Sequence, residues 1–466
     1  MAVLATGCGI LRKPDMSHTS GIAHLQKPRH PLILIPGFLG TKLRDRKTHK
    51  VAWGTMANIF TGRENDALAL PLNSEYPDAA EGGLEPYQIY GSLWGVDYYS
   101  KILRSLQDAG GYQLGDIEHP KPGDNAFVFI YDWRQDNVVV AGQFAQVIAR
   151  LKAALADPDV TFDLITHSQG GLIARYYVKY GGADILDSET PPPPTLAGAA
   201  DIHRVIMLGT PNRGCLGSLK NLHLGIKKYF RPMLPEVVFT MPSLYEMLPP
   251  RGSVLFAHPD GTPFNLDLYD PHTWIREAWS VFSPEAQERL RKKLARKGGS
   301  TAALEESNRR SLEFLTKSLR RAERFHQALN APAAGDSKVA YYAFGSDCIS
   351  TLKTAVVLDR GSRHEILFDN EQFRREKMGD RLAKILYGPG DGTVLMQSLL
   401  DIPDAPEGRK PPRDPGSVEF NSAFFICESH GLLPNDPIFQ NNLFYILLWD
   451  GDRPTSPTTV TPNTGS

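Results

Sequence analysis

The chain has 466 residues, more than most single domains contain, and its formal net charge is −1. A hydrophobic fraction of 41% is ordinary for a globular protein, so the chain can bury a large core. The near-neutral charge excludes a bulk electrostatic attraction to nucleic acid, and no apolar run reaches the ~20 residues that span a bilayer. We therefore expect either one enlarged domain with an insertion or two domains, and no nucleic-acid partner.

The first residues resemble a processing signal. Ala5-Thr6-Gly7-Cys8 is similar to the end of a bacterial lipoprotein signal, where a small residue precedes the cysteine that is lipidated. The apolar stretch before it is shorter than the apolar region of a signal, which has about 7–15 residues, and it lacks a basic start. Two interpretations stay open: a lipoprotein of the bacterial cell envelope whose start lies upstream, or a chance match in an otherwise soluble protein. We expect residues 1–28 to be a lead outside the fold.

The other three cysteines are widely separated in the sequence. Cys215, Cys348 and Cys427 form no CxxC or Cys/His pair that would indicate zinc, and we expect neither a metal site nor a cofactor. We expect them to be buried as small hydrophobic residues, although one disulfide stays open because spacing does not decide pairing.

Short apolar runs bounded by turn residues alternate with segments of helical periodicity. Such runs are typical of strands buried on both faces, and the alternation predicts an α/β fold with a mostly parallel sheet and helices on both sides. The predicted strands are Leu32–Ile35, Ala126–Tyr131, Val160–Thr166, Val205–Leu208 and Val339–Phe344, and the helices between them include Val138–Ala156 and Leu172–Tyr180.

A long segment interrupts this alternation. It runs over residues 216–335 and is too long for a loop, so we expect a cap or lid inserted between a first core part, 29–215, and a second, 336–453. Its charged runs, Arg289–Lys297 and Arg309–Arg324, are expected to be solvated helix faces. Its apolar stretch Met233–Leu248 is either a lid that opens at a lipid interface or the core of the cap itself. Residues 454–466, rich in Thr, Pro, Ser and Gly, are expected to be a disordered tail.

One strand-turn-helix segment carries the chemistry. Thr166-His167-Ser168-Gln169-Gly170-Gly171 follows a predicted strand and opens a predicted helix, which is the context of a nucleophile elbow. The sharp turn requires small residues beside the serine; Gly170 meets this need, while Thr166 replaces the usual first glycine. The elbow predicts an α/β-hydrolase fold with Ser168 as nucleophile. We expect His167 to be a packing residue, because neighbours in a sharp turn point in different directions.

A serine hydroxyl needs a base and an acid, which follow in this fold in the order Ser, acid, His. Gly390-Asp391-Gly392-Thr393-Val394 is a tight turn that presents one carboxylate, and His430 is the only histidine that follows it. We therefore expect Asp391 to be the acid and His430 the base, with Asp401 or Asp404 as alternative acids.

The oxyanion of a tetrahedral intermediate needs two preorganised N–H donors. The residue after the nucleophile supplies one, so we expect the backbone N–H of Gln169 to point at the oxyanion. The glycine-containing loop after the first strand, Pro36–Gly40, supplies the other, and we expect it to be the N–H of Phe38.

These motifs together resemble the lecithin–cholesterol acyltransferase family. His30–Leu43 is similar to its first strand and oxyanion loop, Tyr131–Arg134 to its YDWR segment, Thr166–Gly171 to its elbow, Gly390–Val394 to its acid loop, and His430 to its late histidine. The resemblance implies an acyl-enzyme mechanism on lipid esters under a mobile lid. The region 216–335 departs from it, since no family motif can be carried over there.

The resemblance leads us to expect a lipid O-acyltransferase that acts on phospholipid-like esters. The alternative is a lipid esterase or phospholipase that uses the same three residues, because either a hydroxyl acceptor or water can attack the acyl-enzyme. Both interpretations imply peripheral contact with membranes or lipid aggregates. A non-catalytic lipid-binding relative is a third class, which the intact Ser168, Asp391 and His430 argue against.

Overall fold

The computed structural model describes residues 30–55, 65–72, 83–93, 96–227, 232–361, 363–369, 372, 382–404 and 413–448. The predicted lead (1–28), with its lipoprotein-like Ala5–Cys8, and the predicted disordered tail (454–466) lie outside these residues. Within the described part of the chain, no helix combines the length and the apolar character needed to cross a membrane.

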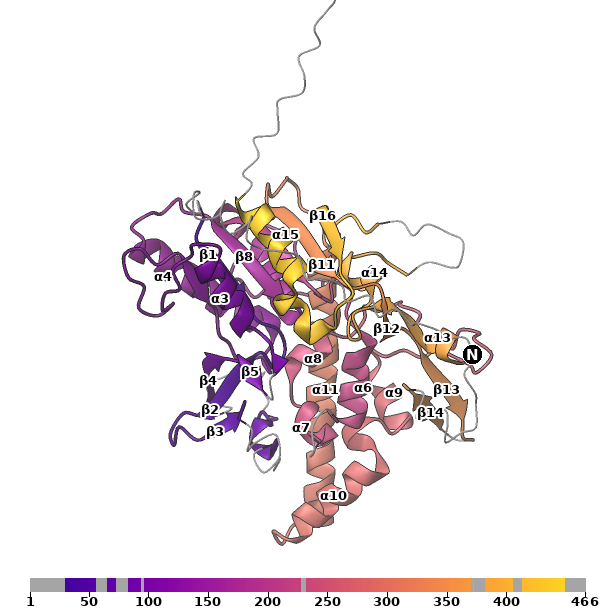
Figure 1. Cartoon of the computed structure of the whole chain (residues 1–466). Coiled ribbons are helices and arrows are strands. Elements are labelled where there is room, and N and C mark those ends of the chain that lie inside the picture. The colour runs from indigo at the N-terminus through magenta and orange to yellow at the C-terminus, as the bar shows by residue number, and fades with distance from the viewer. Residues whose placement is uncertain are drawn as a thin grey trace, which may run out of the picture.

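A six-stranded sheet forms the centre of the molecule, in the order β16-β11-β9-β8-β1-β7 (Figure 1). All its neighbouring strands are parallel, which confirms the predicted α/β class. Each of the five predicted runs contributes one strand. The strands are β1 (Leu32–Ile35), β7 (Ala126–Val128), β8 (Phe162–His167), β9 (Ile202–Leu208), β11 (Ala340–Gly345) and β16 (Phe420–Phe425).

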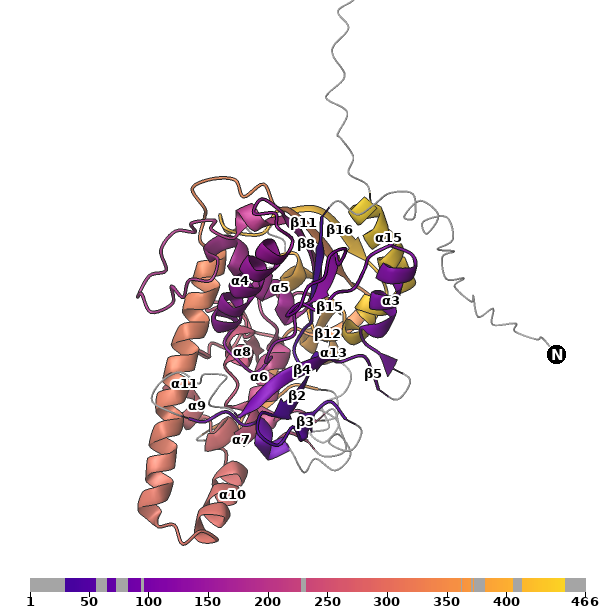
Figure 2. The ribbon, with the colours of Figure 1, turned by 90° about the vertical axis from the view of Figure 1, so that its left-hand side faces the viewer.

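Helices cover both faces of this sheet (Figure 2). Because successive side chains of a strand point to opposite faces, Ile33 and Ile35 join one buried cluster and Leu32 and Leu34 another. The first cluster lies against α4 (Asn137–Ala154) and α5 (Gln169–Tyr180), and the second against α3 (Ser100–Asp108) and α15 (Pro437–Leu448). The buried run of β1 is therefore explained by a hydrophobic layer on each side.

Smaller elements surround the carboxyl ends of the central strands. An antiparallel sheet joins β2 (Thr41–Asp45) to β3 (Val51–Trp53) and β4 (Leu84–Ile89), and a two-stranded ribbon joins β12 (Ile349–Leu352) to β15 (Tyr387–Gly390). The remaining elements are β5 (Ser92–Leu93), β6 (Val96–Asp97), β10 (Phe256–Ala257), β13 (Ala355–Asp359), β14 (His364–Leu367), α13 (Ala383–Leu386) and α14 (Met396–Leu399).

The segment between β9 and β11 is mostly helical. It contains α6 (Leu216–Leu224), α7 (Pro235–Val238), α8 (Pro242–Glu246), α9 (Pro271–Arg276), α10 (Pro284–Ala295) and α11 (Thr301–Asn330). In both views α10 and the start of α11 extend away from the central sheet as a helical hairpin (Figures 1 and 2). The second half of α11 instead packs on α8 and α5.

The apolar stretch Met233–Leu248 is buried in this segment. Val238, Phe239, Met241, Tyr245 and Leu248 are all completely buried and belong to the main hydrophobic cluster. A lid that opens at an interface would have to withdraw these side chains from the core, at a cost of roughly 1.5–3 kcal/mol for each large side chain. The burial therefore favours the second alternative, in which this stretch is the core of the cap.

The charged run of α11 is only partly a solvated face. Near the start of the helix, Arg309 and Arg310 are exposed and pair with Glu306, as expected. Arg321, in contrast, is buried; its guanidinium donates to Asp136 at 2.8 Å and to Asp184 at 2.9 Å. The second half of the run thus anchors the cap to the start of α4, a correction to the sequence prediction.

We expect acid to destabilise the cap through two buried histidines. Burial lowers the pKa of His326 to about 4 and that of His223 to about 4. As the pH falls from about 6.5 to about 4, the unfolded chain takes up protons that the folded chain does not, so the free energy of unfolding should decrease. Urea unfolding across this range should show a smaller decrease for His326→Gln, whose amide can still donate to the Leu248 carbonyl but does not titrate. An equal decrease in wild type and variant would contradict this assignment.

Candidate active site

Ser168 occupies the turn between β8 and α5, in a strained backbone conformation. Its φ is 54° and its ψ is −121°, a combination that costs a non-glycine residue energy and that is typical of nucleophile elbows. Thr166, which replaces the usual first glycine, fits because its hydroxyl donates to the Ile206 carbonyl of the neighbouring strand at 3.2 Å. Gly170 is required, since a Cβ there would lie 2.6 Å from the carbonyl oxygen of Ile35. The predicted strand-turn-helix geometry is present.

The loop after β1 lies directly against this turn. A Cβ at Gly37 would lie 2.7 Å from the Cβ of Ser168, so only glycine allows this close approach. The Tyr131 hydroxyl donates to the Pro36 carbonyl at 2.7 Å and holds the loop in place. Among the described residues, neither the Phe38 N–H nor the Gln169 N–H has a hydrogen-bond acceptor. Two free N–H groups therefore flank the serine, as an oxyanion site requires.

Asp391 and His430 form a hydrogen-bonded pair. The His430 Nδ1 and Asp391 Oδ2 atoms are 2.8 Å apart, and the backbone N–H of His430 donates to the Asp391 carbonyl at 2.9 Å. The other carboxylate oxygen accepts the N–H groups of Thr393 and Val394 at 2.9 and 2.7 Å. Burial alone would raise the pKa of Asp391, but His430 and these two donors outweigh it and lower that pKa below its ordinary value. Asp391 is thus an ionised acceptor that can fix the imidazole with its proton on Nδ1.

Ser168 and His430 line the same cavity without a direct hydrogen bond between them among the described contacts. Such bonds are often long in a free enzyme and shorten when substrate is bound. Gly209, at the end of β9, makes room for the pair: its φ is 53°, and a Cβ would lie 2.8 Å from both Asp391 Oδ2 and His430 Nδ1.

The alternative acids are engaged elsewhere. Asp401 is buried and pairs with Arg175 at 2.7 Å, while it also accepts the N–H of Val418. Asp404 accepts the side-chain amide of Gln397 at 2.7 Å. Asp391 is therefore the acid of the three that contacts His430.

The cavity has a volume of about 830 Å³ and lies between the core and the cap. This is within the range of about 300–1,000 Å³ that ligand sites occupy. Its apolar lining includes Phe38, Trp53, Leu224, Leu244 and Met247, so it can hold a hydrocarbon chain beside the serine.

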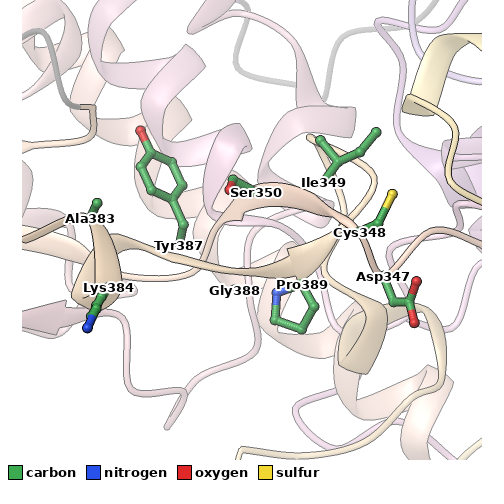
Figure 3. Close-up of a pocket in the computed structure, with 9 residues that line it drawn as sticks. All are labelled: Asp347, Cys348, Ile349, Ser350, Ala383, Lys384, Tyr387, Gly388 and Pro389. Atoms are coloured by element: carbon green, nitrogen blue, oxygen red, sulfur yellow. The ribbon is translucent and has the colours of Figure 1, made fainter. Parts of the chain in front are cut away.

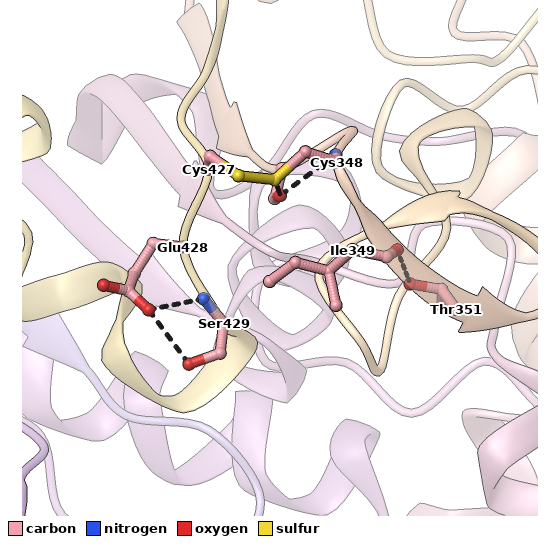
Figure 4. Close-up of a disulfide and its surroundings, with 7 residues drawn as sticks. Cys348, Ile349, Thr351, Cys427, Glu428 and Ser429 are labelled. Carbon is pink, nitrogen blue, oxygen red and sulfur yellow. Dashed lines mark hydrogen bonds between the residues drawn. A yellow bond between two sulfur atoms is a disulfide. The ribbon is translucent and has the colours of Figure 1, made fainter. Parts of the chain in front are cut away.

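A disulfide joins the segment that carries the base to the start of β12, the strand that pairs with the segment leading to the acid (Figure 4). Cys348 immediately precedes β12, whose partner strand β15 ends one residue before Asp391, and Cys427 lies three residues before His430. Two of the three cysteines are thus paired, which is the alternative that their spacing in the sequence left open. Cys215 is the free cysteine among the described residues; it lines the cavity, and burial raises the pKa of its thiol.

The β12–β15 ribbon has a second hollow on it, of about 670 Å³ (Figure 3). Asp347, Lys384 and Pro389 line this hollow, whereas Ser350 and Tyr387 line both the hollow and the large cavity. The ribbon is therefore a wall between two open spaces, with the disulfide at its end.

Two buried residues of the site were not recognised as such from the sequence. His167 was expected only to pack, yet both its ring nitrogens are hydrogen-bonded, one of them to Tyr99 at 2.6 Å. Tyr99 carries no sequence signal, because it lies far upstream of the elbow on the segment that leads into α3.

Comparisons with known proteins support the fold. No protein-family model matches the chain, and no curated protein matches it. Among solved structures, the crystal structure of the Tle4-Tli4 complex is 14% identical with a TM-score of 0.53, covering 90% of this chain and 98% of that chain. Lipase 1 from Pelosinus fermentans is 13% identical (TM-score 0.33; 91% and 99% covered), and phospholipase PlaB from Legionella pneumophila is 16% identical (TM-score 0.22; 46% and 32% covered).

The parallel sheet, the elbow and the cap together define an α/β-hydrolase fold. The comparisons do not identify the chain with the lecithin–cholesterol acyltransferase family, so that resemblance stays a prediction. Similarity at this level of identity establishes the fold alone.

We expect the disulfide to stabilise the site. The bond closes a loop with a sequence separation of 79, and Cys348→Ser/Cys427→Ser should reduce the free energy of unfolding by roughly 4.5 kcal/mol at most. Turnover should fall as well, because the acid and base segments are no longer linked. Urea unfolding and ester turnover measure the two effects. Reductant should reproduce both in the wild type and add nothing to the double variant; a wild type that is indifferent to reductant would contradict the assignment.

Proposed function

We propose that the protein is a serine-dependent enzyme that cleaves acyl esters of lipids through an acyl-enzyme on Ser168. The observation that carries this proposal is the convergence in one cavity of a serine on a strained turn and a hydrogen-bonded His430–Asp391 pair. In the proposed mechanism His430 accepts the proton of the Ser168 hydroxyl as its oxygen attacks the ester carbonyl. Asp391 stabilises the imidazolium that forms.

The oxyanion of the tetrahedral intermediate is proposed to bind the N–H groups of Phe38 and Gln169. Both N–H groups lack an acceptor within the described part of the chain. They can therefore donate hydrogen bonds to the developing oxyanion without breaking an existing bond. His430 then donates its proton to the leaving alcohol, and the acyl group stays on Ser168 as an ester.

These residues are sufficient for hydrolysis of the acyl-enzyme. Water needs no dedicated site, since His430 can deprotonate it once the alcohol has left, whereas acyl transfer requires an acceptor site that excludes water. Lipid O-acyl transfer is the second candidate, favoured by the five ordered motifs that resemble the acyltransferase family. The apolar lining of the cavity supports a lipid acyl chain in both cases.

We also propose that the protein works in an oxidising compartment. Disulfides are rare in proteins that remain in a reducing cytosol, and Cys348–Cys427 is a disulfide between two segments of the proposed site. This supports the cell-envelope interpretation of Ala5–Cys8 over a chance match.

We expect Ser168→Ala to fold normally and to lose several orders of magnitude in turnover of a soluble ester, because the covalent route is removed. His430→Ala and Asp391→Asn should each be severely impaired, and neither should add to the Ser168→Ala loss. Ser422→Ala, at an exposed serine of β16, is the control and should retain full turnover. More than a tenth of wild-type turnover in pure Ser168→Ala protein would refute the nucleophile assignment, whereas a wild type without turnover would favour a non-catalytic lipid-binding protein.

Product analysis distinguishes hydrolysis from transfer. With a radiolabelled phospholipid in vesicles, we expect free fatty acid as the product. When a lipid alcohol is added, the yield of labelled ester should stay below the yield of labelled fatty acid. If most of the label appeared in the ester of the added alcohol, acyl transfer would replace hydrolysis as the assigned reaction while the nucleophile assignment would stand.

A further inference from the structure

Both ring nitrogens of His167 bind groups that belong to other parts of the site. Its Nε2 atom is 2.9 Å from the carbonyl oxygen of His430, and its Nδ1 atom is 2.6 Å from the hydroxyl oxygen of Tyr99. The Tyr99 hydroxyl oxygen also accepts the N–H of Gly37 at 3.0 Å. One chain of hydrogen bonds therefore runs from the loop after β1, through Tyr99 and the residue beside Ser168, to the segment that carries the base.

The chemistry of the donors sets the direction of each bond. A carbonyl oxygen only accepts, so His167 Nε2 carries a proton and donates it to His430. The hydroxyl of Tyr99 accepts from Gly37 and has one proton of its own, which it can donate to His167 Nδ1. This arrangement satisfies all three bonds with a neutral His167 that carries its proton on Nε2.

The environment maintains this arrangement. Tyr99 and His167 have exposed fractions of only 3% and 6%, and burial raises the pKa of Tyr99 well above its ordinary value, so its hydroxyl remains a donor. The rings of His167 and His430 have centroids 4.8 Å apart. A neutral His167 therefore adds no second positive charge beside the imidazolium that His430 forms during the proposed reaction.

We propose that Tyr99 and His167 are positioning residues. They hold the segment that carries His430 and the loop Pro36–Gly40 in fixed positions relative to Ser168, and we call this pair the Tyr99–His167 relay. The inference rests on the proposed function and extends it, because it assigns a role to residues outside the triad and the oxyanion site. The geometry matters because Ser168 and His430 lie on different segments and are not joined directly in the free protein. The relay instead joins His167, the residue before Ser168, to the backbone carbonyl of His430. This bond restricts where the His430 imidazole can move.

Tyr99→Phe removes the hydroxyl and leaves the ring. With a soluble short-chain ester such as p-nitrophenyl butyrate, we expect kcat to fall about tenfold while KM changes less than about twofold, since the polar atoms of both side chains bind protein groups and orient them. His167→Gln should have a similar effect, and the double variant should be no worse than the more impaired single variant, because the two residues act as one unit. Tyr112→Phe is the matched control: Tyr112 is equally buried, at 3%, in the same hydrophobic cluster, and it should retain wild-type kcat.

Hydrogen exchange gives a readout that does not depend on catalysis. In Tyr99→Phe the N–H of Gly37 loses its acceptor, and His167 loses the bond to Nδ1 that fixes its ring against the His430 carbonyl, so amides at Gly37 and in residues 430–433 should exchange faster than in wild type or Tyr112→Phe. Unchanged exchange there, or kcat losses that add in the double variant, would overturn the relay. If the wild-type protein turned over no ester at all, the proposed function would fail, and the exchange rates would still decide whether the relay exists.

Discussion

The close contact between the loop after β1 and the turn at Ser168 is the constraint on which the rest of the site depends. The two segments approach so closely that Gly37 has no room for a side chain. The contact follows from the sheet order, in which β1 and β8 are parallel neighbours and therefore end at the same edge. The positive φ of Ser168 then directs the serine away from the sheet, and the N–H groups of Phe38 and Gln169 have no acceptor among the described residues.

The acid and the base lie on connections outside the strands of the central sheet. Asp391 follows the β12–β15 ribbon, which separates two hollows, and His430 lies in a connection between β16 and α15. Neither position is imposed by the central sheet in the way that Ser168 is. The Cys348–Cys427 disulfide restrains both segments from one side, and the proposed Tyr99–His167 relay restrains the base segment from the other. Precision at the site thus comes from covalent and hydrogen-bonded links between loops.

Local patterns made the fold predictable from sequence and led to Ser168, Asp391 and His430 as the proposed site residues. Buried strands such as Leu32–Ile35 are continuous apolar runs, and the elbow around Ser168 carries its own signature because strand, turn and helix are consecutive. The features that the sequence left undecided or missed depend on contacts between distant segments. The pairing of Cys348 with Cys427, the burial of Arg321 against Asp136 and the contact of Tyr99 with His167 leave no local trace. The choice for Met233–Leu248 between lid and core could not be made either, because an apolar stretch has the same composition in both.

Whether Ser168 is an activated nucleophile is the central question, and covalent labelling answers it most directly. Incubation of the folded protein with a fluorophosphonate, followed by intact-mass and peptide mass spectrometry, should give one adduct per chain, located on Ser168. His430→Ala should slow this labelling by several orders of magnitude, because the serine loses its base. A wild-type protein that stays unlabelled, or that carries the adduct at another residue, would contradict the account.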